Sequence, residues 1–224
     1  MKRLKIMQTL KLSKEELLLY FITAKDTYLN RDLCSITKEA ILGGSTIVQY
    51  REKSKSYKEM KKECLLLKDL CDEYDIKLII NDHVDLVKDV DAHGVHIGQD
   101  DESYKKTRDI IGADKIIGVS VFNEVQALKA QEEGADYLGV GAIFETNSKN
   151  DAKYVTLATL KKITQEVSIP VVAIGGITLN NMEKFKDTHI DGVALISAII
   201  NNEDIKCSTK VLHKKIKKVL KDNS

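Results

Sequence analysis

The sequence has no apolar run long enough to cross a membrane. Its longest apolar stretches, such as residues 169–174 and 193–200, are far shorter than the roughly 20 residues of a membrane-spanning helix, and the N-terminus has no apolar segment like that of a secretory signal peptide. Excess charge of one sign is also missing, because 35 basic and 34 acidic residues leave a formal net charge of +1. No overall field therefore attracts nucleic acid or an anionic membrane. We expect a cytoplasmic protein with neither of these partners, in which any phosphate ligand binds at a local site.

Sequence motifs for zinc, redox disulfides, dinucleotides and nucleotides are lacking. The four cysteines form no C-x-x-C pair, and a chain of 224 residues can bury a core without disulfides, so ordinary reduced thiols are expected. The five histidines show no zinc spacing and no H-E-x-x-H motif. Gly139-Val140-Gly141 lacks the third glycine of a dinucleotide-binding fingerprint, and no Walker loop occurs. The sequence thus gives no indication of zinc, NAD, FAD or a P-loop.

Proline is almost absent, and no proline-, serine- or glycine-rich linker divides the chain. The single proline, Pro170, opens a predicted strand, where a missing N–H group is tolerated. Short runs rich in β-branched residues alternate with helix-like stretches, and consecutive apolar residues such as Leu78-Ile79-Ile80 are typical of strands covered on both faces. Eight βα units of about 28 residues predict a single-domain α/β fold, a small (β/α)8 TIM barrel, with a doubly wound open sheet as the alternative. The predicted strands are residues 18–23, 46–51, 77–81, 94–97, 115–121, 136–143, 169–175 and 192–197.

Helical periodicity predicts helices at residues 57–74, 125–133, 157–167 and 181–186. Residues 1–17 precede the first strand and contain Ser13-Lys14-Glu15-Glu16, a typical capped helix start. We expect them to form a short extra helix that closes the bottom of the barrel, with residues 18–224 as the catalytic barrel domain. The lysine-rich segment 210–221 predicts a solvated last helix rather than a membrane- or nucleic-acid-binding tail. Its residues expected to face inward are Val211, Leu212, Ile216 and Leu220.

Polar side chains follow the predicted strands at the end where a (β/α)8 barrel builds its active site. Alternation along the second strand puts Gln49, Arg51 and Lys53 on one side, where two cations and an amide can bind a polyphosphate; solvated side chains are the alternative. Asp82 follows the third strand and Asp101 the fourth, so two carboxylates converge on one opening. Like charges brought together need a shared proton or a cation, and a nearby phosphate ligand favours Mg2+ held by both carboxylates.

A second anion-binding pattern follows the seventh and eighth strands. Gly175-Gly176 forms a glycine turn, and Ser197 stands at the end of the eighth strand, a placement in which backbone N–H groups bind a monophosphate in many barrels. Ordinary glycine turns are the alternative. The polar segment 141–149 after the sixth strand predicts a flap over the site. Two phosphorylated substrates would then meet at one opening, while His96 is expected to hydrogen-bond inside the barrel.

Seven short segments occur in order between about residue 18 and residue 200. They are Gln49-Tyr50-Arg51-Glu52-Lys53, Asn81-Asp82, Gly94-Val95-His96-Ile97-Gly98-Gln99-Asp100-Asp101, Gly118-Val119-Ser120, Thr146-Asn147-Ser148-Lys149, Ile174-Gly175-Gly176-Ile177 and Ile196-Ser197. Together they resemble the thiamine phosphate synthase family. The resemblance implies a (β/α)8 barrel transferase of thiamine biosynthesis. Such an enzyme joins a hydroxymethylpyrimidine diphosphate to a thiazole phosphate and releases thiamine phosphate and diphosphate with Mg2+.

The resemblance also implies roles for residues at matching positions. The pyrimidine diphosphate would be bound by Gln49, Tyr50, Arg51, Glu52, Lys53, Asn81, Ser120 and Lys149. The thiazole phosphate would be bound by Thr146, Asn147, Ser148, Gly176, Ile196 and Ser197, and the metal by Asp82 and Asp101. The family's mechanism is similar to an ionisation, in which the C–O bond to diphosphate breaks first and the thiazole nitrogen captures the pyrimidine-stabilised cation. Arg51, Lys149 and Mg2+ would stabilise the leaving group, and Ser120 is the third residue expected to take part in catalysis.

Three positions depart from the family pattern. Ala142 and Glu145 stand where prolines are common, and Ser148 replaces a threonine, which leaves the stiffness of this loop and the affinity for thiazole phosphate open. Glu145 resembles the corresponding residue of the related thiazole tautomerases, which form no C–N bond, but Val121 stands where those enzymes carry a histidine. A tautomerase and a non-catalytic protein that binds thiazole phosphate are the alternative functions. A homo-oligomer is also open, as is a role for His93, which stands where the family often has an acid.

Overall fold

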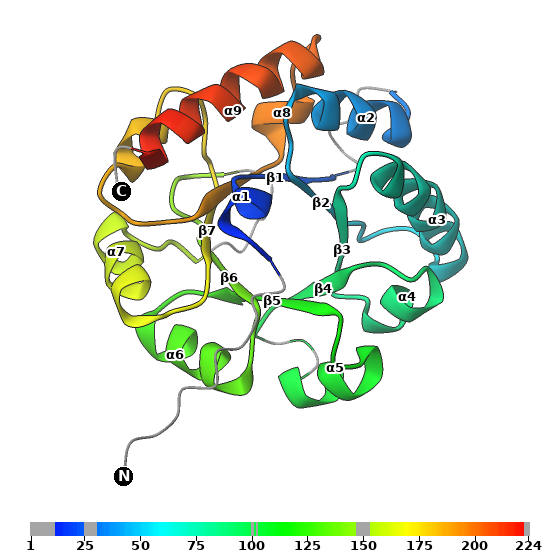
Figure 1. Cartoon of the computed structure of the whole chain (residues 1–224), viewed down its shortest axis with the longest axis horizontal. Helices are drawn as coiled ribbons and strands as arrows, with labels where there is room; N and C mark the ends of the chain where they lie inside the picture. Colours follow the sequence, from blue (N-terminus) through cyan, green and yellow to red (C-terminus); the bar gives the residue numbers. More distant parts are fainter. Residues whose placement is uncertain (1–11, 25–30, 100, 102, 147–152, 222–224) are drawn as a thin grey trace.

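The computed structural model describes residues 12–24, 31–99, 101, 103–146 and 153–221. Within them, eight parallel strands pair in chain order, and the eighth pairs with the first to close a barrel, which helices surround (Figure 1). The single-domain (β/α)8 barrel predicted from the sequence is therefore confirmed, and the open sheet is excluded. The strands are β1 (Leu19–Ile22), β2 (Ile47–Tyr50), β3 (Lys77–Asn81), β4 (Gly94–Ile97), β5 (Ile116–Val121), β6 (Tyr137–Val140), β7 (Val171–Ile174) and β8 (Gly192–Leu195).

The strands are buried because the barrel interior covers one face and the helices cover the other. Every residue of β1, β2, β6 and β8 is buried, which explains the runs of consecutive apolar residues. The sixth strand is shorter than predicted and ends at Val140. The reason is that regular pairing with β7 is interrupted: the Ala142 N–H donates to the Lys153 carbonyl (2.9 Å), and the Val155 N–H donates to the Ala142 carbonyl (2.8 Å). This departure places the segment after β6 at the C-terminal opening of the barrel.

The predicted helices are present except between β7 and β8. There the structure has a single 3-10 turn, η2 (Met182–Phe185), in place of the expected α-helix. Asn181 accepts the Thr178 N–H in a tight turn just before η2, and Asp187 has φ +62° just after it, so too few residues remain for an α-helix. The helices that the structure describes are α1 (Lys14–Leu17), α2 (Leu33–Gly43), α3 (Tyr57–Glu73), α4 (Val84–Asp89), α5 (Tyr104–Ile111), α6 (Glu124–Glu133), α7 (Leu157–Glu166), α8 (Ser197–Ile200) and α9 (Ile205–Lys221).

Helix α1 closes the N-terminal end of the barrel. Ser13 and Glu16 form a capping box, in which the Glu16 N–H donates to the Ser13 hydroxyl (3.2 Å) and the Ser13 N–H donates to the Glu16 carboxylate (2.7 Å). Leu12 and Leu17 are buried and belong to the apolar cluster inside the barrel. In Figure 1, α1 lies across the centre of the ring of strands. The barrel interior is thus sealed at this end and can open only at the other.

Helix α9 begins at Ile205, five residues before the predicted start, and Asp204 caps it by accepting the Cys207 N–H (2.7 Å). Leu212 and Ile216 face the core as expected, but Val211 is 44% exposed, which corrects its predicted inward position. The buried stripe follows the helical repeat through Leu212, and Val211 lies about 100° away from it. No helix in the described ranges has the length and apolar character needed to cross a membrane.

Candidate active site

A cavity of about 320 Å3 opens at the C-terminal ends of the strands. Asn81 and Asp82, at the end of β3, contribute to one side of it, and Gly176 and Ser197, after β7 and β8, contribute to the other. Ser120 of β5 lies in its wall. The two anion-binding regions that the sequence indicated therefore border a single cavity, large enough for small-molecule ligands.

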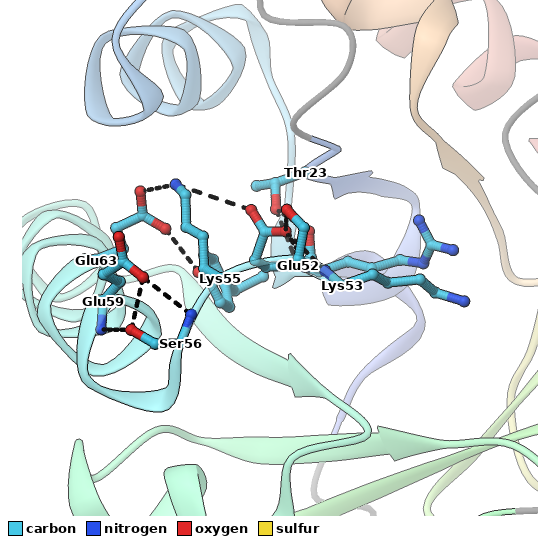
Figure 2. Close-up of polar contacts among 10 residues, drawn as sticks. Thr23, Glu52, Lys53, Lys55, Ser56, Glu59 and Glu63 are labelled. Atoms are coloured by element: carbon cyan, nitrogen blue, oxygen red, sulfur yellow. Dashed lines mark hydrogen bonds and ion pairs between the residues drawn. The ribbon is translucent and has the colours of Figure 1, made fainter.

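The basic side of the cavity is formed by the end of β2 and the loop after it. Gln49, Arg51 and Lys53 all line the cavity, as strand alternation predicted. Thr23 anchors the Arg51 backbone, because its hydroxyl accepts the Arg51 N–H (2.9 Å). The Lys53 side chain extends away from the carboxylates of Glu52, Glu59 and Glu63 (Figure 2). Two cations thus face the same space.

Tyr50 and Glu52, which the resemblance placed among the substrate-binding residues, do not line this cavity. The Tyr50 hydroxyl donates to Glu63 of α3 (2.6 Å), and Glu52 accepts backbone N–H groups of its own loop. Tyr50 is the last residue of β2 and faces the side opposite to Gln49, since adjacent residues of a strand face opposite sides, whereas Glu52 lies in the loop after β2 and is held by that loop. The structure thus places both side chains outside the cavity lining, and their role toward a substrate stays a prediction.

Asp82 and Asp101 come together at the edge of the cavity. Asp82 has φ +62° directly after β3, and its N–H donates to the His96 carbonyl (2.9 Å). Asp101 accepts the Gly98 N–H (2.6 Å), which turns its carboxylate back toward the barrel. Burial, together with the neighbouring Asp101 carboxylate, raises the pKa of Asp82 to about 6. The two carboxylates converge on one opening as predicted, and a shared proton or a cation would relieve their repulsion.

The floor of the cavity is a hydrogen-bonded chain of polar side chains. Gln49 Nε2 donates to the Tyr20 hydroxyl (3.0 Å), and the Tyr20 and Tyr137 hydroxyls lie 2.9 Å apart. The Tyr137 hydroxyl oxygen is 2.9 Å from Nδ1 of His96, and Nε2 of His96 is 2.9 Å from Oγ of Ser120. Burial lowers the pKa of His96 to about 4, so the imidazole is neutral at pH 7. The expected hydrogen bonding of His96 inside the barrel is confirmed, and the chain connects two cavity-lining residues, Gln49 and Ser120.

Sequence reasoning missed Tyr20 and Tyr137, although glycines in the strands carried a signal for them. A Cβ atom at Gly118 would lie 2.1 Å from the Tyr137 ring, and one at Gly139 would lie 2.9 Å from the His96 ring. Both glycines therefore leave room for rings inside the barrel. A glycine within a strand often marks such a close approach, and this explains Gly139 without any dinucleotide site.

The opposite side of the cavity is formed by the turn after β7. Gly176 has φ +61°, and a Cβ atom there would lie 2.3 Å from the Glu145 carbonyl oxygen, so only glycine lets the segment after β6 approach this closely. Thr146 and Ile196 also line the cavity, and Ser197 is exposed at the start of α8. The expected placement of all four residues at one opening is confirmed. Their roles toward a thiazole phosphate stay predictions.

Three of the predicted residues, Asn147, Ser148 and Lys149, lie outside the described residues. Lys153, which follows them, lines the cavity with its Nζ 5.5 Å from the centre of the Phe122 ring, and nothing in the sequence pattern marked either residue. His93 is remote from the cavity, because its Nδ1 accepts the N–H of Leu78 beside the start of β4 (3.0 Å). All four cysteines carry free thiols, as expected.

Comparison with known proteins identifies the family. A family model described as thiamine monophosphate synthase matches residues 19–199. The thiamine-phosphate synthase of Clostridium tetani is 54% identical over 188 residues, which cover 84% of this chain and 90% of that protein. That of Clostridium perfringens is 50% identical over 192 residues, which cover 86% and 92%. The solved structure of the thiamine phosphate pyrophosphorylase from Pyrococcus furiosus superposes with a TM-score of 0.85 at 37% identity, covering 92% of this chain and 98% of that one. The chain belongs to the thiamine monophosphate synthase family.

Proposed function

We propose that the chain is a thiamine-phosphate synthase, which joins a hydroxymethylpyrimidine diphosphate to a thiazole phosphate and releases thiamine phosphate and diphosphate. The observation that carries the proposal is one cavity with a cationic and acidic side for a diphosphate and a glycine turn opposite it for a monophosphate. The relatives named thiamine-phosphate synthase support it. A cytoplasmic location and a homo-oligomer stay predictions.

Asp82 and Asp101 would hold Mg2+. Their oxygens are the hard ligands that Mg2+ prefers, and the raised pKa of Asp82 indicates two carboxylates whose repulsion a dication would relieve. In the described ranges no group of three or more His, Cys, Asp or Glu side chains could hold a metal ion, so phosphate oxygens and water would have to complete the shell of an ion held by these two carboxylates. When bound, Mg2+ supplies positive charge to the departing diphosphate.

The chain's own residues bind and orient the two substrates. Arg51 and Lys53 stabilise the negative charge that develops on diphosphate as the C–O bond breaks. Ser120 and Gln49, fixed by the hydrogen-bonded floor, position the pyrimidine ring, and the Gly176 turn holds the thiazole phosphate. The thiazole nitrogen then captures the pyrimidine cation, and its proximity supplies much of the rate. This chemistry needs no nucleophilic side chain.

Diphosphate release tests the proposal against its two alternatives. Both substrates are incubated with the protein and Mg2+, and diphosphate and thiamine phosphate are measured, with each substrate omitted in turn as the control. A synthase forms the two products in equal amounts and only from the complete mixture. A tautomerase or a non-catalytic thiazole phosphate binder releases no diphosphate, and that result would reject the proposal.

A further inference from the structure

Glu52 lies between two cavity-lining cations in the sequence, yet its side chain faces away from the cavity. It lies on the α3 side of the loop, and Lys53 extends in the opposite direction (Figure 2). The residue is 8% exposed. Its Oε1 accepts hydrogen bonds from the Lys53 N–H (2.8 Å), the Ser54 N–H (2.7 Å) and the Ser54 hydroxyl (2.9 Å). These bonds to one oxygen fix the turn by which the chain leaves β2, and with it the direction of the Lys53 side chain.

Lys55 holds the second carboxylate oxygen of Glu52. Its Nζ lies 3.8 Å from Oε2 of Glu52 and also forms an ion pair with Oε1 of Glu63 on α3 (Figure 2). The other Glu63 oxygen accepts the Tyr50 hydroxyl. The side chains of Glu52, Lys55 and Glu63 are 5%, 20% and 24% exposed, so solvent screens these contacts less than it screens a surface ion pair. One continuous set of contacts therefore joins β2, the loop and α3.

This arrangement leaves Arg51 and Lys53 available for an anionic ligand. In the part of the chain that the structure describes, neither cation forms an ion pair, although Glu52 stands between them. Burial raises the pKa of Glu52, but hydrogen bonds from Ser54 and Lys53 outweigh that effect and hold the pKa below its ordinary value, so the carboxylate is charged. On the cavity side it would compete with a diphosphate for both cations. On the loop side Lys55 balances its charge.

We propose that Glu52 is a positioning residue of the diphosphate site, which fixes the turn that directs Lys53 into the cavity beside Arg51, whose backbone Thr23 anchors. Lys55 and Glu63 hold its carboxylate in place. The inference rests on the proposed function, because it assigns the diphosphate substrate to these two cations. It replaces the direct substrate contact that the sequence resemblance implied for Glu52.

Steady-state kinetics with each substrate varied separately test the inference. Glu52→Ala removes the three hydrogen bonds that Glu52 accepts at the turn, so the KM for the pyrimidine diphosphate is expected to rise about tenfold or more. The KM for the thiazole phosphate stays within about twofold, since that substrate binds on the opposite side of the cavity. Glu52→Gln keeps an oxygen that accepts the same N–H groups and is expected to restore most of the affinity. A side chain in direct contact with the metal or substrate would not be rescued by the neutral amide.

Glu59→Ala is the matched control, because Glu59 also accepts a backbone N–H close to this loop, that of Ser56 in the α3 capping box (2.9 Å). It is expected to lower Tm and leave both KM values unchanged. If Glu52→Ala does not fold, Lys55→Met tests the inference instead, because it removes the ion-pair partner of Glu52. The KM for pyrimidine diphosphate alone is then expected to rise about threefold. Unchanged KM values in the folded variants, or equal losses in Glu52→Gln and Glu52→Ala, would overturn the inference. Absence of turnover by the unaltered protein would instead reject the proposed function.

Discussion

Nε2 of His96 lies 2.9 Å from Oγ of Ser120, and this contact ends the hydrogen-bonded chain that begins at Gln49 on the other side of the cavity. Because His96 is neutral, one of its ring nitrogens donates and the other accepts. The Ser120 hydroxyl and the Gln49 amide are therefore not free to rotate independently. Two side chains at opposite sides of the cavity are thus oriented by one floor, whose members Tyr20, Tyr137 and His96 also line the cavity.

Tyr137→Phe tests this floor, because it removes the hydroxyl that contacts both Tyr20 and His96. Buried partners left unpaired cost about 1–3 kcal/mol of unfolding free energy. A Ser120 hydroxyl that is no longer held in place lowers kcat/KM by about 10- to 100-fold. Denaturant unfolding and steady-state kinetics measure the two effects.

Tyr104→Phe is the control for that variant. The Tyr104 hydroxyl donates to the Gly134 carbonyl (2.6 Å) and accepts from Arg108 (3.1 Å), so it also makes two contacts, but it lies outside the cavity on α5. This variant is expected to lose stability and keep kcat/KM. Equal kinetic losses in the two variants would contradict a specific role for the floor.

The Asp82 and Asp101 pair predicts a pH dependence of stability in the absence of Mg2+. The pKa of Asp82 rises from 3.8 to about 6 in the folded protein. The stabilisation of the fold by protonated Asp82 is therefore fully present below about pH 4 and is lost as the pH rises through about 6. Asp82→Asn removes this loss of stability, because the neutral amide does not repel Asp101 at any pH. With a chelator at pH 7, this variant should be more stable than the unaltered protein by about 1–2 kcal/mol, a value reduced for solvent screening. Chemical denaturation between pH 4 and 7 measures it.

Asp89→Asn is the control of opposite sign, because the hydrogen bond from Lys61 lowers the pKa of Asp89. The charged Asp89 stabilises the fold above the pKa of the unfolded state, so removing the charge is expected to bring no gain in stability at pH 7. Mg2+ should stabilise the unaltered protein and not Asp82→Asn, since only the former keeps both carboxylates. A stability gain of the same size in both variants would exclude repulsion at Asp82 as its cause.

Gly176→Ala tests the thiazole side of the cavity. The added methyl group would meet the Glu145 carbonyl oxygen at 2.3 Å and would also place alanine at φ +61°. The segment after β6 has to move, so the KM for thiazole phosphate should rise about tenfold while that for pyrimidine diphosphate changes little. Gly112→Ala also places alanine at a positive φ (+84°), but the methyl group meets no atom within 4 Å. This variant should lose about 1–3 kcal/mol of stability and leave both KM values unchanged. A rise in the pyrimidine KM of Gly176→Ala as large as that in the thiazole KM would count against the assignment.

Extending the alternation of β2 placed Gln49, Arg51 and Lys53 correctly at the cavity, although the strand ends at Tyr50 and loop contacts hold the last two residues. The family resemblance did not distinguish Tyr50 and Glu52 from the cavity-lining residues: the Tyr50 hydroxyl donates to Glu63 of α3, and Glu52 pairs with Lys55. Contacts between residues far apart in the chain leave no local pattern. For the same reason the Tyr20 and Tyr137 pair, 117 positions apart, could not be predicted from either segment alone.

The rate of diphosphate release as a function of Mg2+ concentration, measured for the unaltered protein and for Asp101→Ala with both substrates present, tests the central claim. We predict that the unaltered protein is inactive with a chelator and saturates with Mg2+, and that the folded variant is slower by a factor of about 100 or more at every concentration. Turnover that persists in the chelator, or a near-normal rate for the variant when Mg2+ is limiting, would contradict the account.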